Sequence, residues 1–109
     1  MKWFGLGKSL KNSVDGLKVL LRERAFKQEL ILGVAVLAVI FFSNTKLYVF
    51  SSYCLVLIAE ALNTGVENAI DRISADYHYI SKKAKDVSSF AVLIAIIHLI
   101  IVMIVSIIS

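Results

Sequence analysis

The feature that most constrains the fold is the apolar stretch 87–109, in which no Asp, Glu, Lys or Arg occurs. A helix of about 20 such residues crosses the hydrocarbon core of a bilayer. Residues 30–42 and 47–70 are also largely apolar, and the short polar segment 43–46 separates them. The pattern predicts an all-α membrane protein with three transmembrane helices, at about 26–43, 47–71 and 87–108.

The composition argues against a soluble fold. Hydrophobic residues make up 59% of the 109 residues, and the mean hydropathy is +0.82. A soluble chain of this size buries only about 60% of the surface that it exposes when unfolded, which would leave much of this apolar surface in water. We therefore expect a single integral-membrane domain over residues 1–109. The one cysteine, Cys54, excludes an internal disulfide.

The positive charges indicate how the spans are oriented. Seven of the twelve Lys and Arg residues lie in 1–29 and four lie in 72–85, so they flank the apolar stretches. They do not alternate with aromatic residues, which argues against a nucleic-acid partner. The positive-inside rule places the N-terminus and the loop 72–86 in the cytoplasm, with the C-terminus on the far side. No A-x-A site precedes the second span, so a cleaved signal peptide is not expected.

The residues before the first span are expected to form an amphipathic surface helix at about 3–22, in the membrane interface. Its apolar side chains recur at steps of three and four, with lysines and an arginine on the other sides. The polar residues 12–16 predict a break or bend partway. The apolar positions are Trp3, Leu6, Leu10, Val14, Leu17 and Leu21.

The segment 5–9 reads GLGKS, which resembles the end of a phosphate-binding loop. That motif needs a further glycine where Lys2 stands, and it needs a preceding strand, so we reject this interpretation.

Residues 59–71 read AEALNTGVENAID, an unexpected set of acids and amides in an apolar span. On a helix, five of the polar members fall within about a 100° arc. The small residues Ala61, Gly65 and Ala69 form another face, which another helix can approach closely. The polar face holds Glu60, Asn63, Thr64, Glu67 and Asp71.

A charged group in the hydrocarbon costs about 2.5–3.5 kcal/mol, so these acids need a water-filled cleft, a metal ion or cationic partners. Ion pairing that merely holds a bundle together is one interpretation, although no Lys or Arg lies in the apolar body of any span. Phosphoryl transfer is the other. Carboxylates suit Mg²⁺ and the phosphates it carries, and a deeper carboxylate can take the proton of a lipid hydroxyl.

Three stretches carry a family resemblance. Residues 23–29 read ERAFKQE, residues 60–72 read EALNTGVENAIDR and residues 76–86 read DYHYISKKAKD. They are similar to the patterns E-x-A-F-[RK]-Q-E, E-x-L-N-[ST]-A-[IV]-E-x-x-x-D-R and [ED]-Y-H-x-[LI]-S-x-x-A-K-D of the prokaryotic diacylglycerol kinases. The resemblance implies a homotrimeric bundle in the bacterial inner membrane, with sites shared between subunits. It implies ATP-dependent phosphorylation of 1,2-diacylglycerol to phosphatidate.

The resemblance also implies roles for individual residues. Glu60 would be the catalytic base, Asn63 would orient the base or the phosphate, and Glu23 and Glu67 would hold the Mg²⁺ that accompanies ATP. The ATP-binding residues would be Glu23, Glu67, Asp71, Asp76, Tyr77, His78, Lys85 and Asp86. The lipid substrate would contact Ala25, Phe26, Lys27, Gln28, Glu29, Glu60 and Ser89.

Departures from the pattern leave alternatives open. Gly65 stands where the family has alanine, and Gly5 stands where the family has a nucleotide-binding arginine, for which Lys8 or Lys2 would substitute. An undecaprenol kinase of the same superfamily and a non-catalytic membrane scaffold remain alternative functions. We interpret His98 as a packing or hydrogen-bonding residue. Trp3, Tyr48 and Tyr53 are expected to form interfacial belts.

Overall fold

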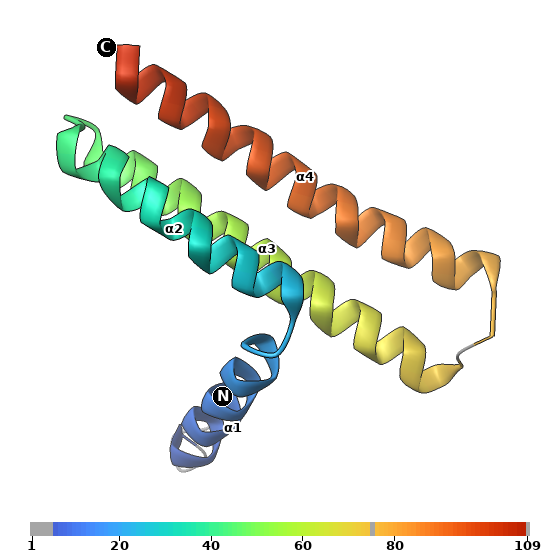
Figure 1. The fold of residues 1–109 in the computed structure, drawn as a ribbon. Coiled ribbons are helices and arrows are strands. Elements are labelled where there is room, and N and C mark those ends of the chain that lie inside the picture. Colours follow the sequence, from blue (N-terminus) through green and yellow to red (C-terminus); the bar gives the residue numbers. More distant parts are fainter. Residues whose placement is uncertain (1–5, 75, 109) are drawn as a thin grey trace.

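The computed structural model describes residues 6–74 and 76–108, which form four helices and no strand. They are α1 (Leu6–Leu20), α2 (Arg24–Phe42), α3 (Lys46–Ile73) and α4 (Tyr79–Ile108). The long helices α2, α3 and α4 run side by side, and α1 leaves them at an angle (Figure 1). Lys2, Trp3 and Gly5 lie outside the described residues, as does the expected start of the surface helix.

The helices confirm the all-α class and the three apolar segments. α2, α3 and α4 are each long and apolar enough to cross a membrane. Many of their large apolar side chains, such as Ile31, Leu47 and Ile101, are exposed on the outside of the bundle, as expected where lipid is the solvent. The expected bend at 12–16 is wrong, because α1 is one continuous helix.

The helix α4 begins at Tyr79, eight residues before the charge-free stretch, so the connection after α3 is only 74–78. Its first turn is supported by His78, whose Nδ1 accepts the backbone N–H of Ile80 at 3.1 Å. One turn further on, Lys82 pairs with Asp86 at 2.6 Å, four residues apart on the same face. The polar residues that we expected in a loop are therefore largely helical.

Three side-chain hydrogen bonds fix the antiparallel register of α3 against α4. Thr45 bonds Ser106 at 2.6 Å, Ser52 bonds His98 Nδ1 at 2.6 Å, and Ser88 donates to Asn63 at 2.7 Å. The two residue numbers add to 150 or 151 in each pair, so one alignment satisfies all three contacts. The Ser52 bond confirms the hydrogen-bonding interpretation of His98. Between these contacts lies an apolar core, formed by Val36, Val49, Val56, Ala95 and Leu99.

The helices α2 and α3 are joined by the tight turn 43–45, so they run antiparallel from a common end. α3 has 28 residues and α2 has 19, a difference of about 13 Å at 1.5 Å per residue. The start of α2 is therefore level with about residue 64, roughly two thirds of the way along α3. Beyond that level, α3 and α4 continue as a pair without α2 (Figure 1).

Tyr53 ties α3 to α2 inside the bundle instead of forming an interfacial belt. Its hydroxyl donates to the backbone oxygen of Glu29 at 2.8 Å, and the ring passes over Gly33. A Cβ atom on Gly33 would lie 2.5 Å from the Tyr53 hydroxyl oxygen. The close approach explains why a glycine occupies this position in α2. Tyr48, by contrast, is exposed.

Gly33→Ala is therefore expected to destabilise the protein, because Tyr53 must swing away and give up its hydrogen bond. Overpacking of this kind costs about 1–3 kcal/mol. Thermal unfolding in detergent micelles measures the loss. Gly65→Ala is the matched control, since no residue of the described segments lies within 4 Å of its added Cβ and alanine favours a helix by up to about 1 kcal/mol over glycine. Adding Tyr53→Phe to Gly33→Ala should recover part of the loss; equal stability of Gly33→Ala and wild type would contradict this packing.

Candidate active site

The polar face of α3 becomes more exposed from its middle towards its C-terminal end. Glu60, Asn63 and Thr64 are buried, with 6%, 8% and 7% of their surfaces exposed. Glu67 is half-buried and Asp71 is exposed. α3 is continuous over all five residues, so they share one face, as the spacing predicted. The face runs from a buried carboxylate to an open polar end.

The first residues of α2 lie near this face because α2 starts level with about residue 64 of α3. Glu23 occupies the N-cap position of α2 and is half-buried. The carboxylates of Glu23, Glu29 and Glu67 are all close enough to Glu60 to act on it electrostatically. Four acids from two helices that are far apart in sequence therefore lie in one region of the bundle.

Bridging by cations does not explain these acids within the described chain. The salt bridges of the described residues join Lys82 to Asp86 and Lys85 to Asp71, and neither involves Glu60 or Glu67. The Glu67 carboxylate instead accepts a hydrogen bond from Asn63 Nδ2 at 3.1 Å. Asn63 thus contacts Glu67, the predicted metal ligand one helical turn away.

Across the described residues, no three acids, histidines or cysteines are close enough together to hold a metal ion by themselves. Mg²⁺ that accompanies a nucleotide is usually bound through only one or two carboxylates, with phosphate oxygens and water as its other ligands. Glu23 and Glu67 are the carboxylates predicted for this role.

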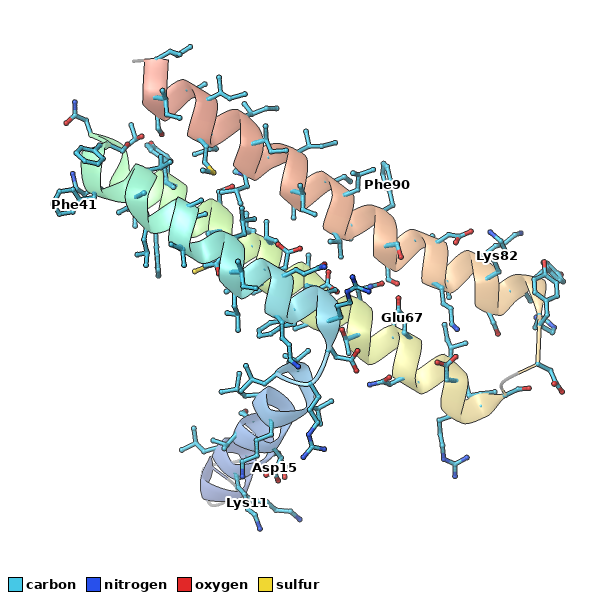
Figure 2. The ribbon with its side chains drawn as sticks, viewed as in Figure 1. Lys11, Asp15, Phe41, Glu67, Lys82 and Phe90 are labelled. Carbon is cyan, nitrogen blue, oxygen red and sulfur yellow. The ribbon has the colours of Figure 1, made fainter. Side chains whose placement is uncertain are left out.

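A polar cleft of about 410 Å³ lies between the C-terminal end of α3 and the N-terminal end of α4. In this cleft, Lys85 Nζ on α4 lies 2.7 Å from Asp71 Oδ1 on α3. The positively charged ammonium group of Lys85 is therefore held between the two helices. Six of the eight predicted ATP-binding residues line this cleft: Asp71, Asp76, Tyr77, His78, Lys85 and Asp86. The other two, Glu23 and Glu67, do not line it. Figure 2 shows Glu67 on α3 and Lys82 on the facing segment of α4.

The sequence reasoning missed Lys82, Ser81 and Ser74, which also line the cleft. It missed Ser88 too, whose hydroxyl donates to Asn63. The signal for Ser88 was its spacing of three residues from Lys85, which puts both on one face of a helix. The neighbouring Ser89, which the resemblance favoured, is exposed.

The predicted lipid-contacting residues 25–29 form the first turns of α2. Phe26 is buried in the bundle with 6% exposed, and Glu29 is half-buried. Ala25, Lys27 and Gln28 are exposed. The exposed and the buried members of this segment therefore lie on different sides of α2.

Comparison with known proteins identifies the family of this chain. A family model described as prokaryotic diacylglycerol kinase matches residues 11–107. A diacylglycerol kinase from Escherichia coli is 44% identical, with 71% of this chain and 66% of the relative aligned. Relatives of the same name from Haemophilus influenzae and Helicobacter pylori are 39% and 37% identical, with 81% and 84% of this chain and 79% and 76% of the relatives aligned.

The chain spans just under two thirds of the length of the Escherichia coli relative that it matches. The family model, however, takes in nearly all of the present chain, including all four helices for most of their length. This chain therefore belongs to the prokaryotic diacylglycerol kinase family.

Proposed function

We propose that this protein is an ATP-dependent lipid kinase that phosphorylates 1,2-diacylglycerol to phosphatidate. One observation carries the proposal. A polar cleft with the ammonium group of Lys85 lies at the open end of α3, and the buried carboxylate of Glu60 lies deeper on the same helix. A nucleotide and a lipid need these two environments at the two ends of one site. The names of the relatives support the same activity.

ATP is proposed to bind in the cleft around Lys85, which has the charge to meet its phosphates. Tyr77 and His78 present aromatic rings at the same cleft. Magnesium bound between the phosphates and the carboxylates of Glu23 and Glu67 would spread the charge that develops on the transferred phosphoryl group. The remaining residues of the site would contribute by binding ATP and the lipid and by orienting them for transfer.

Glu60 is proposed to accept the proton of the lipid hydroxyl. It lies seven residues from Glu67, about 10 Å deeper along the helix axis. Its burial keeps bulk water away, which disfavours hydrolysis of ATP in place of transfer to the lipid. A diacylglycerol molecule with its chains in the bilayer would present its hydroxyl at this depth, near residues 25–29 and Ser89.

The proposed assembly is a homotrimer in the bacterial inner membrane, with α1 in the interface and the N-terminus in the cytoplasm. The face of small residues on α3 supports close approach of another helix, and no described residue lies within 4 Å of a Cβ on Gly65. The positions of the cations support the orientation.

The experiment that tests the activity compares lipid acceptors. Purified protein in mixed micelles receives Mg-ATP with a labelled γ-phosphate and either diacylglycerol or undecaprenol. We expect labelled phosphatidate, and much slower labelling of the polyprenol. The opposite preference would assign the chain to the undecaprenol branch, and no Mg-dependent labelling of either lipid would favour a scaffold.

A further inference from the structure

Ser88 joins the two helices that build the proposed site. Its hydroxyl on α4 donates to Asn63 Oδ1 on α3 at 2.7 Å. The same Asn63 side chain donates from Nδ2 to Glu67 Oε1 at 3.1 Å. The amide of Asn63 is therefore held from both sides, by a hydroxyl of one helix and a carboxylate of its own.

The direction of the Asn63 amide follows from the chemistry of its two partners. An ionised carboxylate only accepts hydrogen bonds, so the NH₂ group must face Glu67. The amide oxygen then faces α4, where Asn63 is buried and needs a donor. Ser88 supplies that donor. Without it, the amide oxygen would lose its partner in a buried setting, and the Asn63 side chain would be held by Glu67 alone.

The hydroxyl of Ser88 also reaches back to its own helix. Its oxygen lies 3.0 Å from the backbone oxygen of Lys85, and the Lys85 side chain crosses to Asp71 at 2.7 Å. These contacts form a chain that runs from Glu67 through Asn63 and Ser88 to Lys85 and Asp71. Ser88 lies between Asn63, which is buried, and Lys85, which lines the cleft.

We infer that Ser88 is a positioning residue for the proposed kinase site: its hydroxyl on α4 holds in place the Asn63 amide, whose NH₂ group faces the Glu67 carboxylate. The inference rests on the proposed function. Ser88 acts through Asn63 and is not assigned a contact with ATP or lipid. Removing its hydroxyl should therefore slow the chemical step and leave the apparent affinity for the lipid largely unchanged.

The test compares Ser88→Ala with Ser88→Thr, which keeps the hydroxyl. Ser88 borders an apolar cavity of about 360 Å³ with Ala91 and Ala95, which leaves room for the added methyl group. Ser51→Ala is the control, because Ser51 is an exposed serine of α3 outside the site. We measure kcat and both KM values in mixed micelles, together with the side-chain amide signals of Asn63 in ¹⁵N-asparagine-labelled protein, assigned with Asn63→Asp.

We expect Ser88→Ala to lower kcat about tenfold, which matches the loss of one buried hydrogen bond. Its KM for diacylglycerol should stay within about twofold, and the Asn63 amide signals should shift. Ser88→Thr and Ser51→Ala should resemble wild type in all of these. If Ser88→Ala fails to fold, Ser88→Cys replaces it, since the thiol keeps the volume but donates weakly.

The inference is overturned if Ser88→Ala keeps the wild-type kcat, if the Asn63 signals do not move, or if Ser88→Thr is impaired as strongly as Ser88→Ala. Failure of the proposed function gives a different result. If the proposed function is wrong, wild type phosphorylates neither lipid. The Asn63 amide signals still report whether the Ser88 hydroxyl holds the amide.

Discussion

Glu60→Gln is expected to keep the helices and the bundle intact and to lower kcat for diacylglycerol phosphorylation by about 10²–10⁴-fold, the usual contribution of a general base. Glutamine has almost the same shape as glutamate but cannot accept the proton of the lipid hydroxyl at neutral pH. Glu60 is 94% buried, where an ionised carboxylate is costly and a neutral amide of the same shape costs less. The variant should therefore be at least as stable as wild type. Labelled phosphatidate formed per enzyme measures the activity, and thermal unfolding in detergent measures the stability.

Thr64→Val is the matched control for Glu60→Gln. Thr64 is buried to a similar extent, one turn further along the same face of α3, and it has no role in the proposed chemistry. Its variant should keep kcat within a few-fold of wild type. Near-normal turnover by Glu60→Gln, with the control also active, would show that another group accepts the proton.

Lys85→Met is expected to raise KM for ATP by about 10–150-fold, because a hydrogen bond to a charged group contributes about 1.5–3 kcal/mol. Methionine keeps much of the length and apolar volume of lysine while removing the charge. The KM for diacylglycerol should change little, since the cleft lies at the open end of α3, away from Glu60. Steady-state kinetics with each substrate varied in turn separates the two effects.

Lys83→Met controls for the loss of one positive charge from the same helix. Lys83 is exposed, its Nζ lies 5.2 Å from the centre of the Tyr79 ring, and it does not line the cleft. We expect its KM for ATP to stay close to wild type. Equal effects of Lys83→Met and Lys85→Met would mean that the overall positive charge, and not the cleft, attracts the nucleotide.

Local patterns in the sequence predicted most of the architecture. Hydropathy alone locates the three long helices, because a membrane span must satisfy its backbone internally and expose apolar side chains. The steps of three and four between Glu60, Asn63, Glu67 and Asp71 predicted their common face, since a continuous helix makes that geometry unavoidable. The family resemblance selected six residues that the fold then gathers in one cleft.

Contacts between helices were harder to predict, because they depend on register and on which of several polar residues faces the neighbour. Ser88 and Ser89 are both serines of α4, and only the pairing of α3 with α4 shows that Ser88 meets Asn63. Tyr53 has the composition of an interfacial residue, but the glycine at position 33 opens a place for its ring inside the bundle. The start of α4 at Tyr79 differs from the expected loop 72–86 for another reason. Charged residues such as lysine are compatible with a helix, so their presence does not by itself indicate a loop.

The most direct test of the account measures the transfer of labelled γ-phosphate from ATP to diacylglycerol by the purified chain in mixed micelles, with and without Mg²⁺, beside Glu60→Gln and Glu67→Gln. The account predicts Mg²⁺-dependent formation of phosphatidate by wild type, with both variants folded and nearly inactive. Absence of labelled phosphatidate from folded wild-type protein, or equal labelling by all three proteins, would contradict it.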